Sequence, residues 1–273
     1  MSGVASGSTA SSMPCPTRPD VPTCSVRAII FDWGGTLTPF HDIDLLDLWR
    51  AAAEVLAPDR VDEVSQALAR AEAQWWQQAV ASGRSGTTAD VLAAAAEATG
   101  FDVDAALHDR ALAAHLEAWT PHTIADPQAA PLLTALRERG IRTGLLSNTH
   151  WPRAWHERWL ARDGLLELLD ARTYTSDLAH LKPHPEAFRA AMEATAADGE
   201  PLRPEQVVFV GDRPLDDISG AQAFGMRTVL LPGSLRASTV NPDNAVPDHP
   251  VEPDLRAAGL GDVLTAVDAW RRS

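Results

Sequence analysis

The apolar run from Val26 to Phe31 constrains the fold more than any other part of the sequence. It is too short for a helix and rich in branched side chains, which is typical of a buried parallel strand. The run ends at Asp32, and Gly34 and Gly35 follow. In a doubly wound sheet, ligands bind at the carboxyl ends of the strands. We therefore expect Asp32 to lie in a functional site; the alternative is an aspartate that only caps a turn.

The segment from residue 43 to 119 is helical in pattern throughout. Apolar side chains recur at helical spacing, Gly83 and Gly86 separate the second helical stretch from the third, and Thr87 and Thr88 predict the start of that third helix. Four consecutive helices cannot continue a βαβ pattern, so we expect a helical module inserted after the first strand. Within it we expect the rings of Trp75 and Trp76 to pack; the alternative is that one ring faces a cleft.

Helical and strand patterns alternate from residue 126 onward. Strands are predicted at 142–149, 172–175, 206–210 and 227–231, and a short edge strand and a closing helix are predicted within 254–270. A helix is predicted over 152–169 and another over 218–224. This alternation predicts an α/β fold with a doubly wound, Rossmann-like parallel sheet. We predict a core domain of residues 25–41 and 121–273 and an inserted helical cap domain of residues 42–120.

Composition restricts the class of partner. The formal net charge of −14 argues against nucleic acid or an anionic membrane surface as the main partner. No run approaches the length of a membrane span. Residues 1–24 are rich in Ser, Gly, Pro and Thr, which predicts a disordered leader rather than a signal peptide, and Cys15 and Cys24 match no common metal or redox motif. We expect a cytoplasmic enzyme; the sequence carries no signal for its oligomeric state.

Polar residues follow each of the predicted strands that could meet at one edge of the sheet. The chain's only lysine is Lys182, and it lies in a loop with two prolines. We therefore expect a functional role for Lys182; the alternative is an ordinary surface lysine. The other candidates are Ser147 and Asn148 after the second strand, and Asp212, Asp216 and Asp217 after the fourth.

In their order and spacing these motifs resemble the haloacid dehalogenase (HAD) superfamily, phosphatases in particular, over roughly residues 27–231, with an α-helical cap of the C1 type. The resemblance implies that Asp32 is a nucleophile that becomes an aspartyl phosphate and that Lys182 is the catalytic cation beside it. It also implies a small phosphorylated metabolite as substrate and Mg²⁺ as cofactor. The implied phosphate-binding residues are Thr36, Ser147, Asn148 and Lys182, and the implied metal ligands are Asp32, the Gly34 carbonyl, Asp212 and Asp217.

These residue types suit that chemistry on physical grounds. Phosphoryl transfer needs positioning and cations near the non-bridging oxygens, which Lys182 and Mg²⁺ would supply. Magnesium prefers a few carboxylates, carbonyls and waters. Simpler interpretations stand beside these: Ser147 could be a turn residue, and Asp216 or Asp217 could cap the following helix.

Position 34 departs from the phosphatase pattern. Phosphatases of this superfamily carry a second aspartate two residues after the nucleophile, where it acts as general acid and base, and Gly34 cannot do so. Such catalysis is worth about a hundredfold to ten-thousandfold. Either the substrate has a good leaving group, such as an acyl phosphate, or His41 or His150 donates the proton; either histidine could instead be a plain loop residue.

Three other functions compete with a metal-dependent phosphatase. A phosphonatase-like enzyme also lacks the second aspartate, but it forms a Schiff base with a cap lysine, and this cap has none. A metal-independent 2-haloacid dehalogenase lacks an acidic metal ligand in the fourth motif, where this chain keeps Asp212. A catalytically weak phosphate-binding or regulatory module is the third. We favour the phosphatase, with Arg50, Arg70, Arg84 and Arg110 as possible cap contacts for an anionic substrate or as exposed helix charges.

Overall fold

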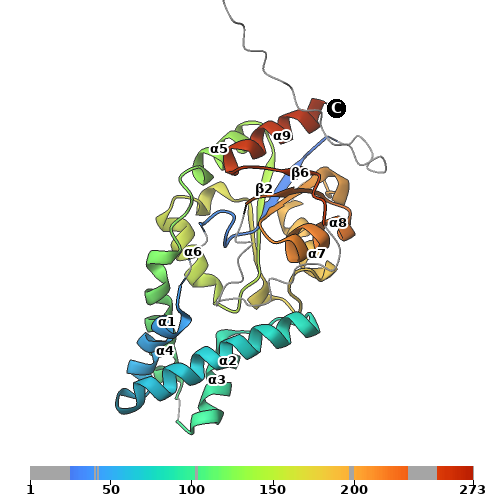
Figure 1. Cartoon of the computed structure of the whole chain (residues 1–273). Coiled ribbons are helices and arrows are strands. Elements are labelled where there is room, and N and C mark those ends of the chain that lie inside the picture. Colours follow the sequence, from blue (N-terminus) through green and yellow to red (C-terminus); the bar gives the residue numbers. More distant parts are fainter. Residues whose placement is uncertain are drawn as a thin grey trace, which may run out of the picture.

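A computed structural model describes residues 25–39, 41, 43–101, 104–196, 200–232 and 251–272. Within these residues the core is a six-stranded parallel sheet (Figure 1). The strands are β1 (Ala28–Phe31), β2 (Arg142–Ser147), β3 (Ala171–Tyr174), β4 (Val207–Gly211), β5 (Arg227–Leu230) and β6 (Leu255–Arg256). The core helices are α5 (Ala129–Glu138), α6 (Arg153–Arg162), α7 (Pro185–Ala196), α8 (Gly220–Phe224) and α9 (Leu260–Arg272).

The strand order places β1 at the switch point of the sheet. The order is β3-β2-β1-β4-β5-β6, so the chain builds outward from β1 on one side and then from β4 on the other. Phe31 at the end of β1 pairs with Leu145 of β2 and Val210 of β4. Residues that follow β1, β2 and β4 therefore meet in the crevice where such sheets bind ligands.

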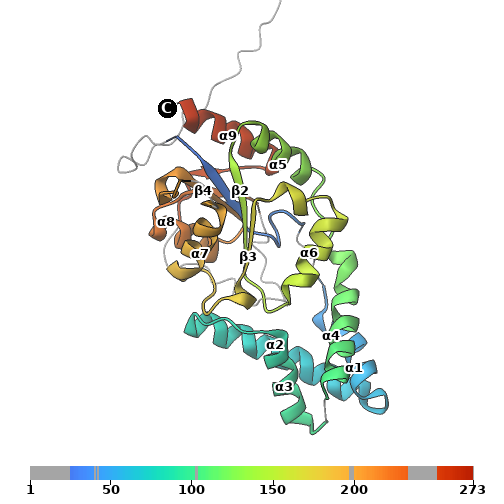
Figure 2. The same cartoon turned by 180° about the vertical axis from the view of Figure 1, so that it is seen from behind.

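Each face of the sheet has its own apolar core because successive strand residues point to opposite faces. In β1, Ile29 and Phe31 pack in the cluster that includes α5 and α9, while Ile30 packs in the cluster that includes Phe188 of α7. Figure 2 shows α5, α6 and α9 on one side of the sheet and α7 and α8 on the other. The predicted doubly wound α/β fold is confirmed.

Four helices between β1 and α5 lie together at the end of the molecule opposite α9 (Figures 1 and 2). They are α1 (Leu45–Leu56), α2 (Val61–Ser82), α3 (Thr88–Thr99) and α4 (Ala105–Trp119). As predicted, Thr87 begins α3: its backbone N–H donates to Asp90 Oδ2 (2.7 Å) in a capping box. We refer to these helices as the cap, and the division at residues 42 and 120 stays a prediction.

Several predicted boundaries shift. The helix predicted over 152–169 ends at Arg162, because Gly164 adopts a left-handed conformation (φ +71°), and a short 3₁₀ turn follows at Leu166–Leu168. The helix predicted over 218–224 begins earlier, as a π-helical segment at Pro214–Ser219. The edge strand and closing helix near the C-terminus are confirmed as β6 and α9. The predicted leader (1–24) and residues 233–250 of the predicted long loop lie outside the described residues.

Within the described residues, no helix combines the length and the apolar character that crossing a membrane requires.

Candidate active site

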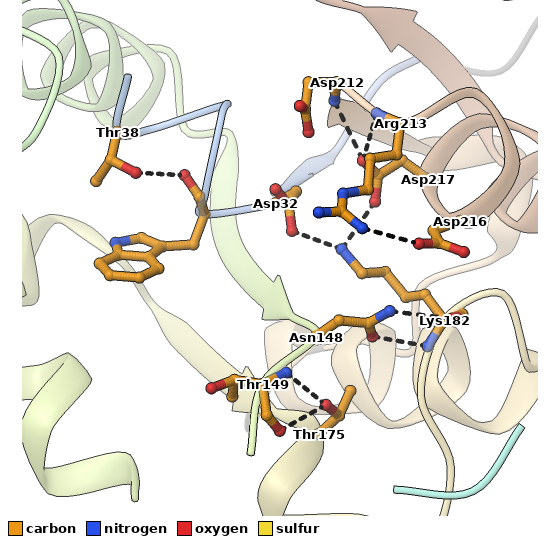
Figure 3. A network of polar contacts seen from close by, with 11 residues as sticks. Asp32, Thr38, Asn148, Thr149, Thr175, Lys182, Asp212, Arg213, Asp216 and Asp217 are labelled. Carbon is orange, nitrogen blue, oxygen red and sulfur yellow. Dashed lines mark hydrogen bonds and ion pairs between the residues drawn. The ribbon is translucent and has the colours of Figure 1, made fainter. Parts of the chain in front are cut away.

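A lysine lies between two carboxylates at the ends of β1 and β4 (Figure 3). Lys182 Nζ donates to Asp32 Oδ1 (2.6 Å) and to Asp217 Oδ1 (2.8 Å). The three side chains are almost wholly buried, with Lys182 1 % exposed. Asp32 follows β1, Asp217 belongs to the π-helical segment after β4, and Lys182 comes from the loop before α7, so three distant stretches of sequence build one ion cluster.

Backbone geometry fixes the acidic loop after β4. Asp217 Oδ2 accepts from the backbone N–H groups of Asp212 (3.1 Å) and Arg213 (2.9 Å), which closes the loop around its carboxylate. A Cβ at Gly211 would clash with the Asp217 side chain, and a Cβ at Gly35 (φ +86°) would clash with the Asp212 carboxylate. Both glycines are therefore required for the close approach of backbone and carboxylates.

The cluster carries more negative than positive charge. Among the described residues, the fixed positive charges that face Asp32, Asp212, Asp216 and Asp217 are those of Lys182 and Arg213. Arg213 Nη1 lies 3.6 Å from Asp216 Oδ2. Burial and the charges of Asp32 and Asp217 raise the pKa of Asp212 to about 8, and burial raises the pKa of Asp216 to about 6.

The same burial and neighbouring charges shift the pKa values of Asp32 and Lys182. Burial raises the pKa of Asp32, and the charge of Lys182 offsets this only in part. For Lys182, burial would lower the pKa, but Asp217 and Asp32 outweigh it and raise the pKa, so the ammonium stays charged.

The predicted metal ligands suit a divalent cation. Carboxylate oxygens of Asp32, Asp212 and Asp217 all lie within 4.8 Å of one another. Asp212 Oδ1 is buried without a hydrogen-bond partner among the described residues, which is costly unless a cation or donor binds it. Clustered carboxylate oxygens with an excess of negative charge are the donor set that Mg²⁺ prefers. Gly34, the fourth predicted ligand, lines the cavity beside Asp32.

The predicted phosphate-binding residues differ in their position and in the hydrogen bonds that they already make. Ser147 is buried at the end of β2 and lines the cavity. Asn148 Oδ1 accepts from Lys182 N (2.8 Å) and Asn148 Nδ2 donates to Lys182 O (3.0 Å), so one amide hydrogen remains for a ligand. The Asn148 side chain thus also orients the lysine. Thr36 is buried, and its hydroxyl has no partner within the described part of the chain.

A buried network that the sequence did not predict joins the cap to the core. Glu72 of α2 lies with Oε1 2.9 Å from His150 Nε2, and its Oε2 accepts from Trp49 Nε1 (2.6 Å). His150 Nδ1 lies 2.9 Å from Thr88 Oγ1 of α3. Both ring nitrogens of His150 are therefore engaged with the cap. No local signal marks these residues as partners, since Glu72 and His150 are 78 positions apart.

The remaining predicted residues fall on either side of the cavity. His41 is exposed and lines it, 5.8 Å between ring centroids from His122. Trp76 also lines the cavity, whereas Trp75 packs against the apolar cluster. The structure thus agrees with the alternative in which one of the two rings faces a cleft. The four predicted cap arginines lie elsewhere: Arg50 pairs with Asp62, and Arg70, Arg84 and Arg110 are exposed.

Comparison with known proteins supports what the geometry indicates. The chain is 36 % identical over 170 residues to a phosphoglycolate phosphatase of Cereibacter sphaeroides. The aligned region covers 60 % of this chain and 72 % of that protein. It is 31 % identical over 127 residues to a glyceraldehyde 3-phosphate phosphatase of Methanopyrus kandleri, covering 46 % of this chain and only 52 % of that protein.

A solved structure shares the fold. It is the L-2-haloacid dehalogenase of Xanthobacter autotrophicus, with a TM-score of 0.57 at 22 % identity, covering 89 % of this chain and 98 % of that one. The sequence model of the haloacid dehalogenase-like hydrolases matches residues 26–225. With this match over most of its length and with Asp32, Lys182 and Asp212 gathered at one sheet edge, the chain belongs to the haloacid dehalogenase-like hydrolase family.

Proposed function

We propose that the protein is a Mg²⁺-dependent phosphatase, located in the cytoplasm, that hydrolyses a small phosphorylated metabolite through an aspartyl phosphate on Asp32. The observation that carries the proposal is the buried contact of Lys182 Nζ with Asp32 and Asp217, with Asp212 beside them. A nucleophilic carboxylate that is oriented by a cation suits attack on a phosphate dianion. The phosphatases among the related proteins support the same reaction class.

The first half-reaction follows from how Asp32 is held. Lys182 binds Asp32 Oδ1, which leaves the second carboxylate oxygen to form a bond to phosphorus as the bond to the leaving oxygen breaks. Ser147 and the free amide hydrogen of Asn148 would donate to phosphoryl oxygens. When bound by Asp32, Asp212, Asp217 and the Gly34 carbonyl, Mg²⁺ would supply further positive charge against these oxygens.

The leaving oxygen takes its proton from another source than position 34. Of the two candidate histidines, His41 fits better, because both nitrogens of His150 already contact the cap. A leaving group that is stable as an anion would need no donor. Water then attacks phosphorus, the acyl phosphate bond breaks, and inorganic phosphate and free Asp32 are formed.

Asp212 is the residue that separates this proposal from a dehalogenase. A metal-independent dehalogenase has no use for a second and third carboxylate within 4.8 Å of its nucleophile, since these repel a carboxylate substrate. A phosphatase that binds a divalent cation uses such carboxylates as metal ligands.

Phosphate release tests the proposal. Wild type and the Asp32→Asn variant would be assayed with a panel of phosphomonoesters and acetyl phosphate, in Mg²⁺ or in EDTA, and chloride release from a chloroacid would be measured in parallel. We expect turnover that requires Mg²⁺ and is lost in Asp32→Asn. Chloride release without metal would establish the dehalogenase instead, and phosphate binding without any turnover would establish a binding module.

A further inference from the structure

The cavity beside Asp32 has an aromatic wall. Its volume is about 150 Å³, and four of the nine tryptophans of the chain line it: Trp33, Trp76, Trp119 and Trp151. Trp76 and Trp119 come from the cap helices α2 and α4, and Trp33 and Trp151 from the loops after β1 and β2. Asp32 and Asp216 line the same cavity, so a substrate bound at Asp32 extends toward these rings.

Neighbouring rings hold this wall in place. Trp33 stacks on Trp159 with 5.7 Å between ring centroids and an interplanar angle of 9°. The ring centroids of Trp119 and Trp151 lie 4.8 Å apart, and those of Trp76 and His150 lie 5.8 Å apart. A preformed apolar surface of fixed rings favours an apolar, planar ligand, because little ordering is needed on binding.

The wall offers little to a second anion. Among the described residues that line the cavity, only Lys182 and Arg213 carry a fixed positive charge, and both already contact carboxylates. None of the arginines in the described part of the cap lines it. Glu72 does line it. Burial would raise the pKa of Glu72, but its hydrogen bonds to His150 and Trp49, together with the electrostatic influence of His150 and His115, outweigh burial and lower the pKa, so the side chain is an anion. A substrate carboxylate would therefore meet like charge, and no lysine or arginine among the described lining residues lacks a carboxylate partner.

We propose, on the basis of the phosphatase function above, that the substrate is a monoester whose organic part is an aromatic or similarly planar apolar group with no second negative charge, and that Trp76 and Trp119 select it. The Trp151 indole N–H is buried without a partner among the described residues, so it can donate to one polar atom of that group. An aryl oxygen also leaves as a stabilised anion, which suits a site without an aspartate at position 34.

Two alkyl phosphates separate ring recognition from leaving-group chemistry. Benzyl and ethyl phosphate both release an alcohol of similar basicity and differ mainly in the ring. We expect kcat/KM for benzyl phosphate to exceed that for ethyl phosphate at least about tenfold, because burying several carbons in an apolar pocket discriminates at this level. Phosphoglycolate, which carries a carboxylate beside its phosphate, should be the poorest of the three.

Matched variants assign the preference to the wall. Trp76→Leu should reduce the benzyl-to-ethyl ratio severalfold, whereas Trp155→Ala, which alters a tryptophan outside the cavity, should leave the ratio unchanged. Trp119→Leu should also reduce it; melting temperatures would identify a variant that is only unfolded. Binding of benzylphosphonate and ethylphosphonate, measured by calorimetry, gives a readout that needs no turnover.

The outcomes distinguish the two proposals. Phosphate release with equal rates for benzyl and ethyl phosphate, or with phosphoglycolate preferred, overturns the substrate class and leaves the phosphatase intact. Release from none of the esters, with benzylphosphonate still bound about tenfold more tightly than ethylphosphonate in a Trp76-dependent manner, overturns the phosphatase and supports the aromatic site. Neither turnover nor a binding preference overturns both.

Discussion

Placing an aspartate at position 34, where this chain has a glycine, should supply a carboxylic general acid. A Cβ at Gly34 meets no heavy atom within 4 Å, and Gly34 is not one of the glycines with positive φ, so the backbone accepts a Cβ there without strain. The new carboxylate would join four others that surround Lys182 and Arg213, and this repulsion raises its pKa toward the protonated form that an acid needs.

The size of the gain depends on the leaving group. General acid catalysis is worth about a hundredfold to ten-thousandfold, or roughly 3–5 kcal/mol of barrier, when the leaving oxygen is a poor anion. We therefore expect Gly34→Asp to accelerate hydrolysis of ethyl phosphate by about this factor and to change acetyl phosphate hydrolysis little. In wild type, rates should fall steeply as the leaving group becomes more basic, and in Gly34→Asp this dependence should flatten.

Gly34→Asn is the matched control, since it has the same shape without an acidic proton. Steady-state phosphate release from ethyl, benzyl and acetyl phosphate would be compared in the three proteins. The reasoning is refuted if Gly34→Asp keeps its melting temperature and yet shows no gain on ethyl phosphate, or if Gly34→Asn gains as much.

Three further perturbations follow from buried charges. The pKa of Asp212 is raised from 3.8 to about 8 in the folded chain, so between these pH values the folded state holds a proton that the unfolded state has lost. The stability of the protein in EDTA should therefore fall as the pH rises from about 4 to 8. In a plot of melting temperature against pH, Asp212→Asn should lack this part of the slope. Lys182→Met should abolish turnover and, by leaving buried carboxylates unpaired, cost roughly 3–5 kcal/mol in urea denaturation, and an unchanged midpoint would contradict the buried pairing. Glu72→Ala, which leaves His150 and an indole N–H without their acceptor, should destabilise the chain by about 2–4 kcal/mol, whereas Glu72→Gln should cost less than half of that.

The sheet and the position of its ligand edge could be predicted because they depend on local patterns. Short apolar runs delimit β1 and β4, and the polar residues directly after them must meet if the strands are parallel neighbours. Asp32, Asp212 and Lys182 therefore converge as expected. The start of α3 was also predictable, since Thr87 and Asp90 form a cap within four residues.

Contacts between residues far apart in the sequence, and contacts set by tertiary packing, could not be predicted in this way. Asn148 is 34 residues from Lys182, and nothing in either segment marks the carboxamide as a partner of the lysine backbone. The engagement of His150 by Glu72 and Thr88 likewise depends on how the cap packs, and it removes a histidine that sequence alone offered as a proton donor. The π-helical segment after Arg213 arises because Asp217 folds back onto the N–H groups of the loop, a tertiary effect that helical periodicity does not contain.

Trapping the phosphorylated enzyme tests the central claim most directly. Wild type mixed with acetyl phosphate and Mg²⁺ would be quenched in acid during turnover and analysed by intact-mass and peptide mass spectrometry. We predict a mass increase of one phosphoryl group on the peptide that contains Asp32, absent in Asp32→Asn. Continued turnover with no covalent phosphate, or with the phosphoryl group on another residue, would contradict the assignment of Asp32 as the nucleophile.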